Sequence, residues 1–165
     1  MASRSKPRQI LGLVGWLIVS FAASAVGAVA SIQAKSFYGQ LVQPGWAPPS
    51  YVFGPVWTVL YALMAVAAWL VWRSGGFHTN RIALSFFLVQ LALNALWSWL
   101  FFAWQHGALA FADIVLLCVF IVVTLGSFWH VRPLAGALLI PYLLWVSFAA
   151  ALNYSLWQLN PQILG

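Results

Sequence analysis

The sequence predicts an all-α integral membrane protein built as a bundle of five transmembrane helices. Of its 165 residues, 64% are hydrophobic and only 5% are Asp, Glu, Lys or Arg, whereas charged residues make up about a quarter of an ordinary soluble domain. The apolar residues fall into five long segments, each free of Lys, Arg and Glu. Because a helix needs roughly 20 apolar residues to cross a bilayer core, each segment can span a membrane. This composition excludes a water-soluble globular protein.

The segments are separated by residues that a membrane helix avoids. The breaks are a Pro- and Gly-rich stretch at 35–50, the Gly75-Gly76 pair within 73–81, the turn at 105–107, and Arg132 with Pro133. Uninterrupted apolar runs favour helices over the alternating strands of a membrane barrel. The predicted spans are residues 10–34, 51–72, 82–104, 109–130 and 134–158.

Residues 1–165 are expected to form a single membrane domain, because five spans use nearly all of the apolar residues. Three of the four connections are short, so neighbouring helices must pack antiparallel. The first loop, 35–50, is longer, and its stiff run 43–49 contains Trp46 and three prolines. Loops of this length are uncommon unless they act as lids or linkers, and we expect a lid.

The basic residues predict how the chain is oriented in the membrane. Six of the seven share one side, on the N-terminal tail and the second and fourth connections, and only Lys35 lies on the other. Positive residues concentrate inside, so the N-terminus is predicted inside and the C-terminus outside. A bacterial inner membrane is expected, with the outer membrane as the alternative. The N-terminal segment with Ala28-Val29-Ala30 also resembles a signal peptide, although its apolar run exceeds the usual length of about 7 to 15 residues.

Few ionisable side chains are present, and this excludes several kinds of site. Asp113 is the one acidic residue and Cys118 the one cysteine, which excludes paired-carboxylate catalysis, carboxylate-rich Ca²⁺ or Mg²⁺ sites, and thiolate clusters. His78 lies in a loop, and His106 and His130 lie near opposite membrane faces, so no metal site is expected. The basic residues that give the +6 net charge are distributed as membrane-orientation signals usually are, so nucleic-acid binding is not expected. Neither a required cofactor nor ordinary acid–base catalysis is expected.

Nine of the eleven tryptophans divide into two groups by depth. Trp is enriched at membrane interfaces, which accounts for those near the span ends. Trp57, Trp97 and Trp145 lie deeper, and the interface does not explain them. Counted at 1.5 Å per residue from the outer helix ends, they and neighbouring polar residues lie about 7 to 20 Å deep. The tryptophans assigned to the interface are Trp16, Trp69, Trp72, Trp104, Trp129 and Trp157.

The deep aromatic and amide residues keep helical register on three spans. Amides at this depth must face protein partners or a wet cavity, because hydrocarbon leaves them unsatisfied. Two interpretations remain open: an interhelical hydrogen-bond cluster with aromatic packing, or a pocket for a flat, largely apolar ligand. The residues that share these faces are Trp57 and Tyr61 on the second span, Asn94 and Trp97 on the third, and Trp145, Ala149, Leu152 and Asn153 on the fifth.

Three more residues within the spans are unusual. Pro55 and Pro141 remove backbone donors and are expected to kink the second and fifth spans, either opening space between helices or curving them for packing. Asp113 is the one intramembrane acid. It is either a polar anchor near the pocket or a group that holds loop backbone close to the start of its helix.

Several runs of residues occur in an order and spacing characteristic of one membrane family. They are Pro44-Gly45-Trp46-Ala47-Pro48-Pro49, the runs 53–61 and 90–97, the isolated Asp113, and 141–145 continuing to Tyr154. Through these motifs the sequence resembles the translocator protein family (TspO/MBR), also called tryptophan-rich sensory proteins or peripheral-type benzodiazepine receptors. The resemblance covers nearly all of the chain from the first span to Asn160.

The resemblance implies a five-helix bundle, commonly a homodimer, with a pocket that binds porphyrins such as protoporphyrin IX and benzodiazepine-site ligands. It implies that Trp46 lies in a lid over this pocket. Some family members are reported to promote light-dependent porphyrin breakdown, for which the positions of Trp57 and Trp145 are implicated. The residues it places in the cavity wall are Trp57, Tyr61, Asn94, Trp97, Trp145, Ala149 and Leu152, to which helical register adds Asn153.

We therefore expect a membrane sensor or translocator that binds protoporphyrin IX or a related tetrapyrrole. One alternative is a light-dependent porphyrin-degrading enzyme that uses Trp57 and Trp145. Another is a structural or regulatory membrane partner without a ligand. Sterol binding is in doubt, because Tyr154 is not followed by the basic residue that the proposed sterol motif requires.

Overall fold

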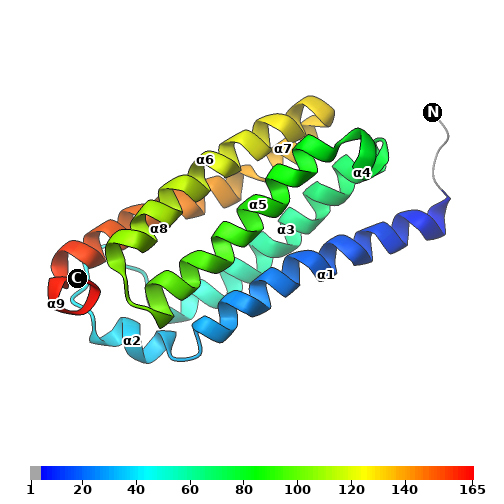
Figure 1. The fold of residues 1–165 in the computed structure, drawn as a ribbon. Helices are drawn as coiled ribbons and strands as arrows, with labels where there is room; N and C mark the ends of the chain where they lie inside the picture. The colour runs from blue at the N-terminus through cyan, green and yellow to red at the C-terminus, as the bar shows by residue number, and fades with distance from the viewer. Residues whose placement is uncertain (1–4) are drawn as a thin grey trace.

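The computed structural model describes residues 5–165, and these residues form helices and connecting loops without a strand. Long helices that follow one another in the sequence run antiparallel, and α1 begins at the opposite end of the bundle from α2 and α9 (Figure 1). The helices are α1 (Lys6–Ala30), α2 (Ala34–Gln40), α3 (Phe53–Arg73), α4 (Gly76–Thr79), α5 (Arg81–Ser98), α6 (Gly107–Val131), α7 (Pro133–Ala137), α8 (Ile140–Leu159) and α9 (Pro161–Leu164), with a 3₁₀ turn at Ser50–Val52 and a π-helical segment at Trp99–Ala103.

Five helical stretches of the described chain are long and apolar enough to cross a membrane. Their apolar side chains face outward as well as inward, as expected for helices solvated by lipid and not by water. The predicted all-α membrane fold with five spans is confirmed. The stretches are Lys6–Ala30, Ser50–Arg73, Arg81–Ala103, Gly107–Val131 and Pro133–Leu159.

The first connection differs most from its predicted boundaries. The first helix ends at Ala30, and the stretch expected as a loop contains the short helix α2. Two adjacent aromatic residues of α2 are buried: Phe37 packs edge-on against Phe101 at 6.0 Å, and Tyr38 packs against Phe53 at 5.4 Å. Burial of these rings stabilises a helical turn that the Gly- and Pro-rich composition did not indicate.

The two prolines behave differently from each other. Pro55 lies in the first turn of α3, just after the 3₁₀ turn at Ser50–Val52. The first backbone N–H groups of a helix have no acceptor within it, so the missing N–H of Pro55 does not interrupt α3. Pro141 lies in the first turn of α8, directly after a break at residues 138–139 that separates α7 from α8. The fifth span is therefore interrupted where its proline predicted.

Trp16 corrects the interpretation of the interface tryptophans. It lies about 15 Å along α1 from the first helical residue and is only 8% exposed. Its ring packs edge-to-face on Phe87 at 5.7 Å, so Trp16 belongs to the core and not to an interfacial belt. Trp104 and Trp129, by contrast, are about half exposed near helix ends.

The hairpin between α6 and α7 depends on a glycine. A Cβ atom added to Gly136 would lie 2.9 Å from the backbone Cα of Trp129, closer than real contacts allow. A Cβ added to Gly126, one turn before Trp129 on α6, would meet nothing within 4 Å. The two glycines therefore form a matched pair, one in a tight contact and one in open space.

We expect Gly136→Ala to lower stability by about 1 to 3 kcal/mol, because α7 would have to move away from α6. Gly126→Ala should be neutral or slightly stabilising, since alanine is the better helix former. The check is the apparent melting temperature of each variant in the same mild detergent. Equal melting temperatures for the two variants would contradict this account of the hairpin.

Candidate ligand-binding site

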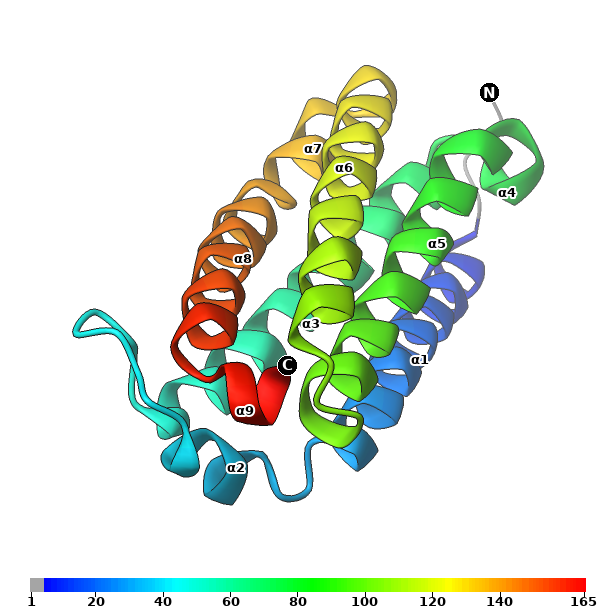
Figure 2. The same ribbon diagram turned by 60° about the vertical axis from the view of Figure 1, so that its left-hand side comes forward.

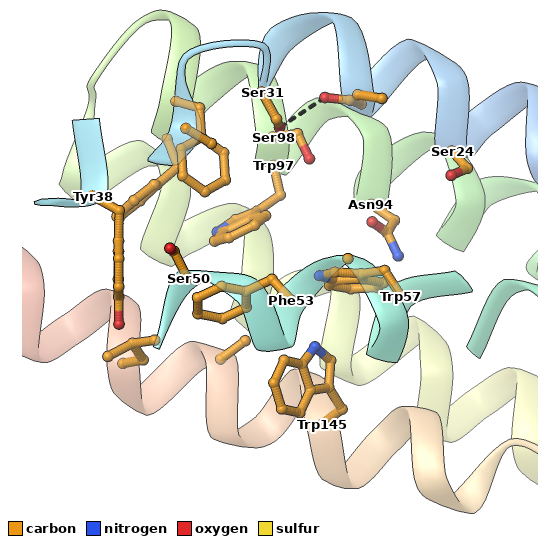
Figure 3. A pocket seen from close by; sticks show the side chains of 18 of the residues that line it. Ser24, Ser31, Tyr38, Ser50, Phe53, Trp57, Asn94, Trp97, Ser98 and Trp145 are labelled. Carbon is orange, nitrogen blue, oxygen red and sulfur yellow. Dashed lines mark hydrogen bonds between the residues drawn. The ribbon is translucent and has the colours of Figure 1, made fainter. Parts of the chain in front are cut away.

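A cavity of about 410 Å³ lies between α1, α2, α3, α5 and α8, toward the end of the bundle where α2 lies. Its volume falls within the range of small-molecule sites, which is about 300 to 1,000 Å³. Figure 3 shows side chains from several helices converging on it. The wall is formed by Ser24, Gly27, Ala28, Ser31, Ala34, Lys35, Tyr38, Ser50, Phe53, Gly54, Trp57, Thr58, Tyr61, Asn94, Trp97, Ser98, Phe101, Phe102, Trp145, Ala149, Leu152, Asn153 and Leu156.

The structure brings eight of the nine sequence-predicted site residues to this wall. They come from three spans that are well separated in sequence, and their side chains meet because each set keeps one helical face. Their role in binding stays a prediction. The eight are Trp57, Tyr61, Asn94, Trp97, Trp145, Ala149, Leu152 and Asn153.

Trp46 is the predicted site residue that does not line the cavity. Its ring packs on Phe148 of α8 at 5.7 Å and is 49% exposed. The connection that carries it projects at the α2 end of the bundle, beside α8 and α9 (Figure 2). Trp46 therefore covers the outer surface of α8, and the wall at this end is formed by α2.

Hydrogen bonds at both ends hold this connection. Asn160 Oδ1 accepts from the Val42 backbone N–H at 2.8 Å, and Asn160 Nδ2 donates to the Val42 carbonyl at 2.9 Å. At the other end, the Tyr38 hydroxyl donates to the Pro48 carbonyl at 2.8 Å. Burial raises the pKa of Tyr38, which keeps that hydroxyl protonated and able to donate. The segment is therefore anchored to α2 and to the end of α8.

The sequence analysis missed the contribution of α1 to the cavity. Ser24, Gly27, Ala28 and Ser31 line it, and their small side chains leave the space that larger residues would fill. A Cβ added to Gly27 would lie 3.1 Å from Ser98 Oγ, so α1 and α5 already approach closely here. The stripe of small residues along the first span was the available signal, and it fits close helix packing equally well.

Asn94 is the centre of a buried hydrogen-bond network across three helices. Its Oδ1 accepts from the Tyr61 hydroxyl at 3.1 Å, and its Nδ2 donates to the Tyr142 hydroxyl at 2.7 Å. The Tyr142 hydroxyl in turn donates to Gln90 Oε1 at 2.6 Å. These side chains are at most 4% exposed, so the network links α3, α5 and α8 inside the bundle.

A second amide fixes the indole of Trp97. Trp97 Nε1 donates to Asn153 Oδ1 at 2.9 Å, and Asn153 Nδ2 donates to the Gly107 carbonyl at 3.2 Å. The indole also stacks on Phe101 at 5.4 Å with an 18° angle between the rings. Phe101 belongs to the π-helical segment, and such segments often re-aim side chains at functional sites. An interhelical network therefore exists and a cavity lies beside it, while binding of a flat ligand in that cavity stays a prediction.

Trp145 differs from Trp97 because its donor has no partner. Trp145 Nε1 is buried, and no hydrogen-bond acceptor for it lies among the residues that the structure describes. In Figure 3 the indole nitrogen points toward the side of the cavity where Phe53 and Trp57 lie. A ligand with an acceptor atom could satisfy this N–H, which is otherwise costly to bury.

Asp113 does not line the cavity. It lies in the second turn of α6, is 7% exposed, and its Oδ2 has no hydrogen-bond partner in the described part of the chain. It caps no helix and holds no loop backbone there, so neither of the roles considered for it is seen. Across residues 5–165 no three His, Cys, Asp or Glu side chains are grouped as metal ligands.

Comparisons with known proteins identify the family of this chain. The sequence model of the TspO/MBR family matches residues 14–158. The chain belongs to the TspO/MBR family. It is therefore a multi-pass integral membrane protein.

Relatives of this TspO/MBR chain come from bacteria, archaea and animals. It is 43% identical over 129 residues to the tryptophan-rich protein TspO of Chlorobaculum tepidum, covering 78% of this chain and 82% of the relative. It is 36% identical over 152 residues to the Archaeoglobus fulgidus protein of the same name, and the match covers 92% of this chain and 98% of the relative. The translocator protein of Homo sapiens is 38% identical over 126 residues, 75% of each chain.

We expect Asn94→Leu to destabilise the protein by about 1 to 2 kcal/mol, because the buried Tyr61 hydroxyl loses its acceptor and the Tyr142 hydroxyl keeps only Gln90 as a partner. Thr58→Val is the control, since the Thr58 hydroxyl donates only to the Gly54 carbonyl of its own helix. Apparent melting temperatures in detergent would compare the two variants. Asn94→Leu behaving like Thr58→Val would show that the network adds nothing to stability.

Proposed function

We propose that this TspO/MBR protein binds a flat, largely apolar macrocycle, with protoporphyrin IX as the reference ligand, and acts as a membrane sensor or translocator. The observation that carries the proposal is the convergence of Trp57, Trp97 and Trp145 on one cavity. Indole faces stack well on planar conjugated rings and bury large apolar area. No cofactor is needed for binding of this kind.

The polar groups in the wall support a specific orientation of the ligand. The side-chain amide of Asn94 and the indole N–H of Trp97 are already bonded within the protein. The Trp145 N–H has no acceptor among the described residues, so it is available to a ligand acceptor. Aromatic faces with a buried, unused donor suit recognition of a large ring by stacking together with a directional bond.

The names of the relatives describe two related activities. A relative from Cereibacter sphaeroides is named a tryptophan-rich sensory protein, and the animal relatives are named translocator proteins. For this chain we propose that the two descriptions share one step, occupation of the cavity. Transport would also require a second access state of the protein, different from the conformation of this structure.

The proposal includes an arrangement in the membrane. The described basic residues other than Lys35 lie at the end of the bundle where α1 begins, which favours that end inside and the α2 end outside. We propose the bacterial inner membrane, with the outer membrane as the alternative, and a homodimer as the assembly. Sterol is not proposed as a ligand. Thiol labelling of single cysteines placed at each end, in intact cells, would test the orientation.

Protoporphyrin IX should quench the tryptophan fluorescence of the purified protein at a one-to-one stoichiometry. The double variant Trp57→Phe Trp145→Phe should bind about 3- to 10-fold more weakly, because two stacking indoles become smaller rings. Trp129→Phe is the control, since Trp129 is half exposed at the far end of α6. Unchanged affinity in the double variant, or no ligand-induced rise in melting temperature, would instead indicate a structural or regulatory partner without a ligand.

A second candidate function is light-dependent porphyrin degradation, favoured by the position of Trp57 and Trp145 on the wall itself. An indole in contact with a photoexcited macrocycle could donate an electron or trap the oxygen product, with molecular oxygen as the oxidant. Under illumination, the Soret absorption of bound protoporphyrin IX should fall faster with the native protein than with Trp57→Phe Trp145→Phe. Equal rates at equal occupancy would exclude this activity.

A further inference from the structure

Lys35 is the one charged residue in the wall of the cavity. It lies in the first turn of α2, on the same helical face as Tyr38, three residues on, and close to Ser31 at the end of α1. Lys35 is exposed, whereas Tyr38 is buried. This places the lysine at the mouth of the cavity, between its aromatic interior and the surroundings.

Among the described residues, none forms an ion pair with Lys35. Asp113 is the only acidic side chain of the chain, it lies on α6, and it is not part of the wall. The other described cations are at the start of α1, the end of α3 and the starts of α5 and α7, all at the opposite end of the bundle (Figure 1). The cavity therefore carries a single positive charge at its mouth.

The helix that carries Lys35 is held in place. Phe37 packs on Phe101 and on Phe102, and the Tyr38 hydroxyl bonds the Pro48 carbonyl. These contacts fix Phe37 and Tyr38, which lie two and three residues after Lys35 on the same short helix. The backbone of Lys35 is therefore held beside the cavity. The side chain of Lys35 is flexible, but its attachment to α2 is fixed, so its ammonium group stays within reach of the cavity mouth.

The cavity is lined by aromatic rings along its length and carries its one charge at the mouth. Trp57 and Asn94 lie away from α2, and Trp97 and Phe53 lie between them and Tyr38 of α2 (Figure 3). A molecule matched to this wall has an apolar planar body and an anionic edge. Stacking on indoles would hold the body, and the ammonium group of Lys35 would pair with the anion.

We infer that Lys35 recognises a carboxylate of the ligand, so that the cavity selects planar tetrapyrroles carrying acidic side chains and holds them with those side chains toward α2. The inference rests on the proposed function, and it specifies the class of tetrapyrrole and its orientation. It also assigns a binding role to a residue that otherwise would only anchor α2 at the membrane surface.

The test compares protoporphyrin IX, which has two carboxylates, with its neutral dimethyl ester. Both are titrated into the purified full-length protein in a non-ionic detergent at fixed ionic strength. Native protein should prefer the acid, and Lys35→Gln should weaken acid binding about 10-fold while changing ester binding less than 2-fold. Lys35→Arg should keep most of the preference for the acid over the ester. Higher salt should weaken acid binding to the native protein and to Lys35→Arg, but not to Lys35→Gln.

Lys6→Gln is the matched control, because it removes one positive charge at the opposite end of the bundle. It should leave the preference for the acid unchanged, and the melting temperatures of all variants should match that of the native protein. A Lys35→Gln variant that binds acid and ester as the native protein does would overturn the inference and leave the proposed function standing. Native protein that binds neither porphyrin would overturn the proposed function itself.

Discussion

In a bilayer, a polar group that turns away from water must find its partner inside the protein. The arrangement of this bundle follows from how its buried amides meet that requirement. Asn94 bonds Tyr61 of α3 and Tyr142 of α8, so one side chain holds three spans at fixed rotation. Asn153 does the same for α8 and the start of α6, and it sets the indole of Trp97. Because a rotation of any one helix would break these bonds, the faces presented to the interior are well defined.

The cavity exists because the network and the packing around it leave space toward α2. Toward the N-terminal end, Trp16, Phe87 and Phe128 fill the interior with interlocking rings. Toward α2, small residues such as Gly27 and Ala28 take the place of large ones on α1, and space remains beside the indoles. Dense packing stabilises one half of the bundle, and the other half contains the cavity.

The scarcity of charge restricts what the cavity can do. Its wall offers aromatic faces, amides that are already bonded, one unpartnered indole N–H and a single cation at the mouth. Such a set can bind and orient a planar molecule. Its titratable side chains are Lys35 at the mouth and the tyrosines Tyr38 and Tyr61, whose hydroxyls already donate to the Pro48 carbonyl and to Asn94.

The sequence by itself determined the membrane class, the five spans and eight of the residues around the cavity, because apolar length and helical register are local properties of the chain. Tertiary structure decided the rest. Trp16 was assigned to the interface, yet its ring is buried against Phe87, because depth along a span does not reveal which side chains a neighbouring helix covers. Trp46 was expected over the cavity, but Asn160, 118 residues away from Val42 in sequence, directs its connection along α8. Contacts between residues so distant in the chain leave no periodic signal in the sequence.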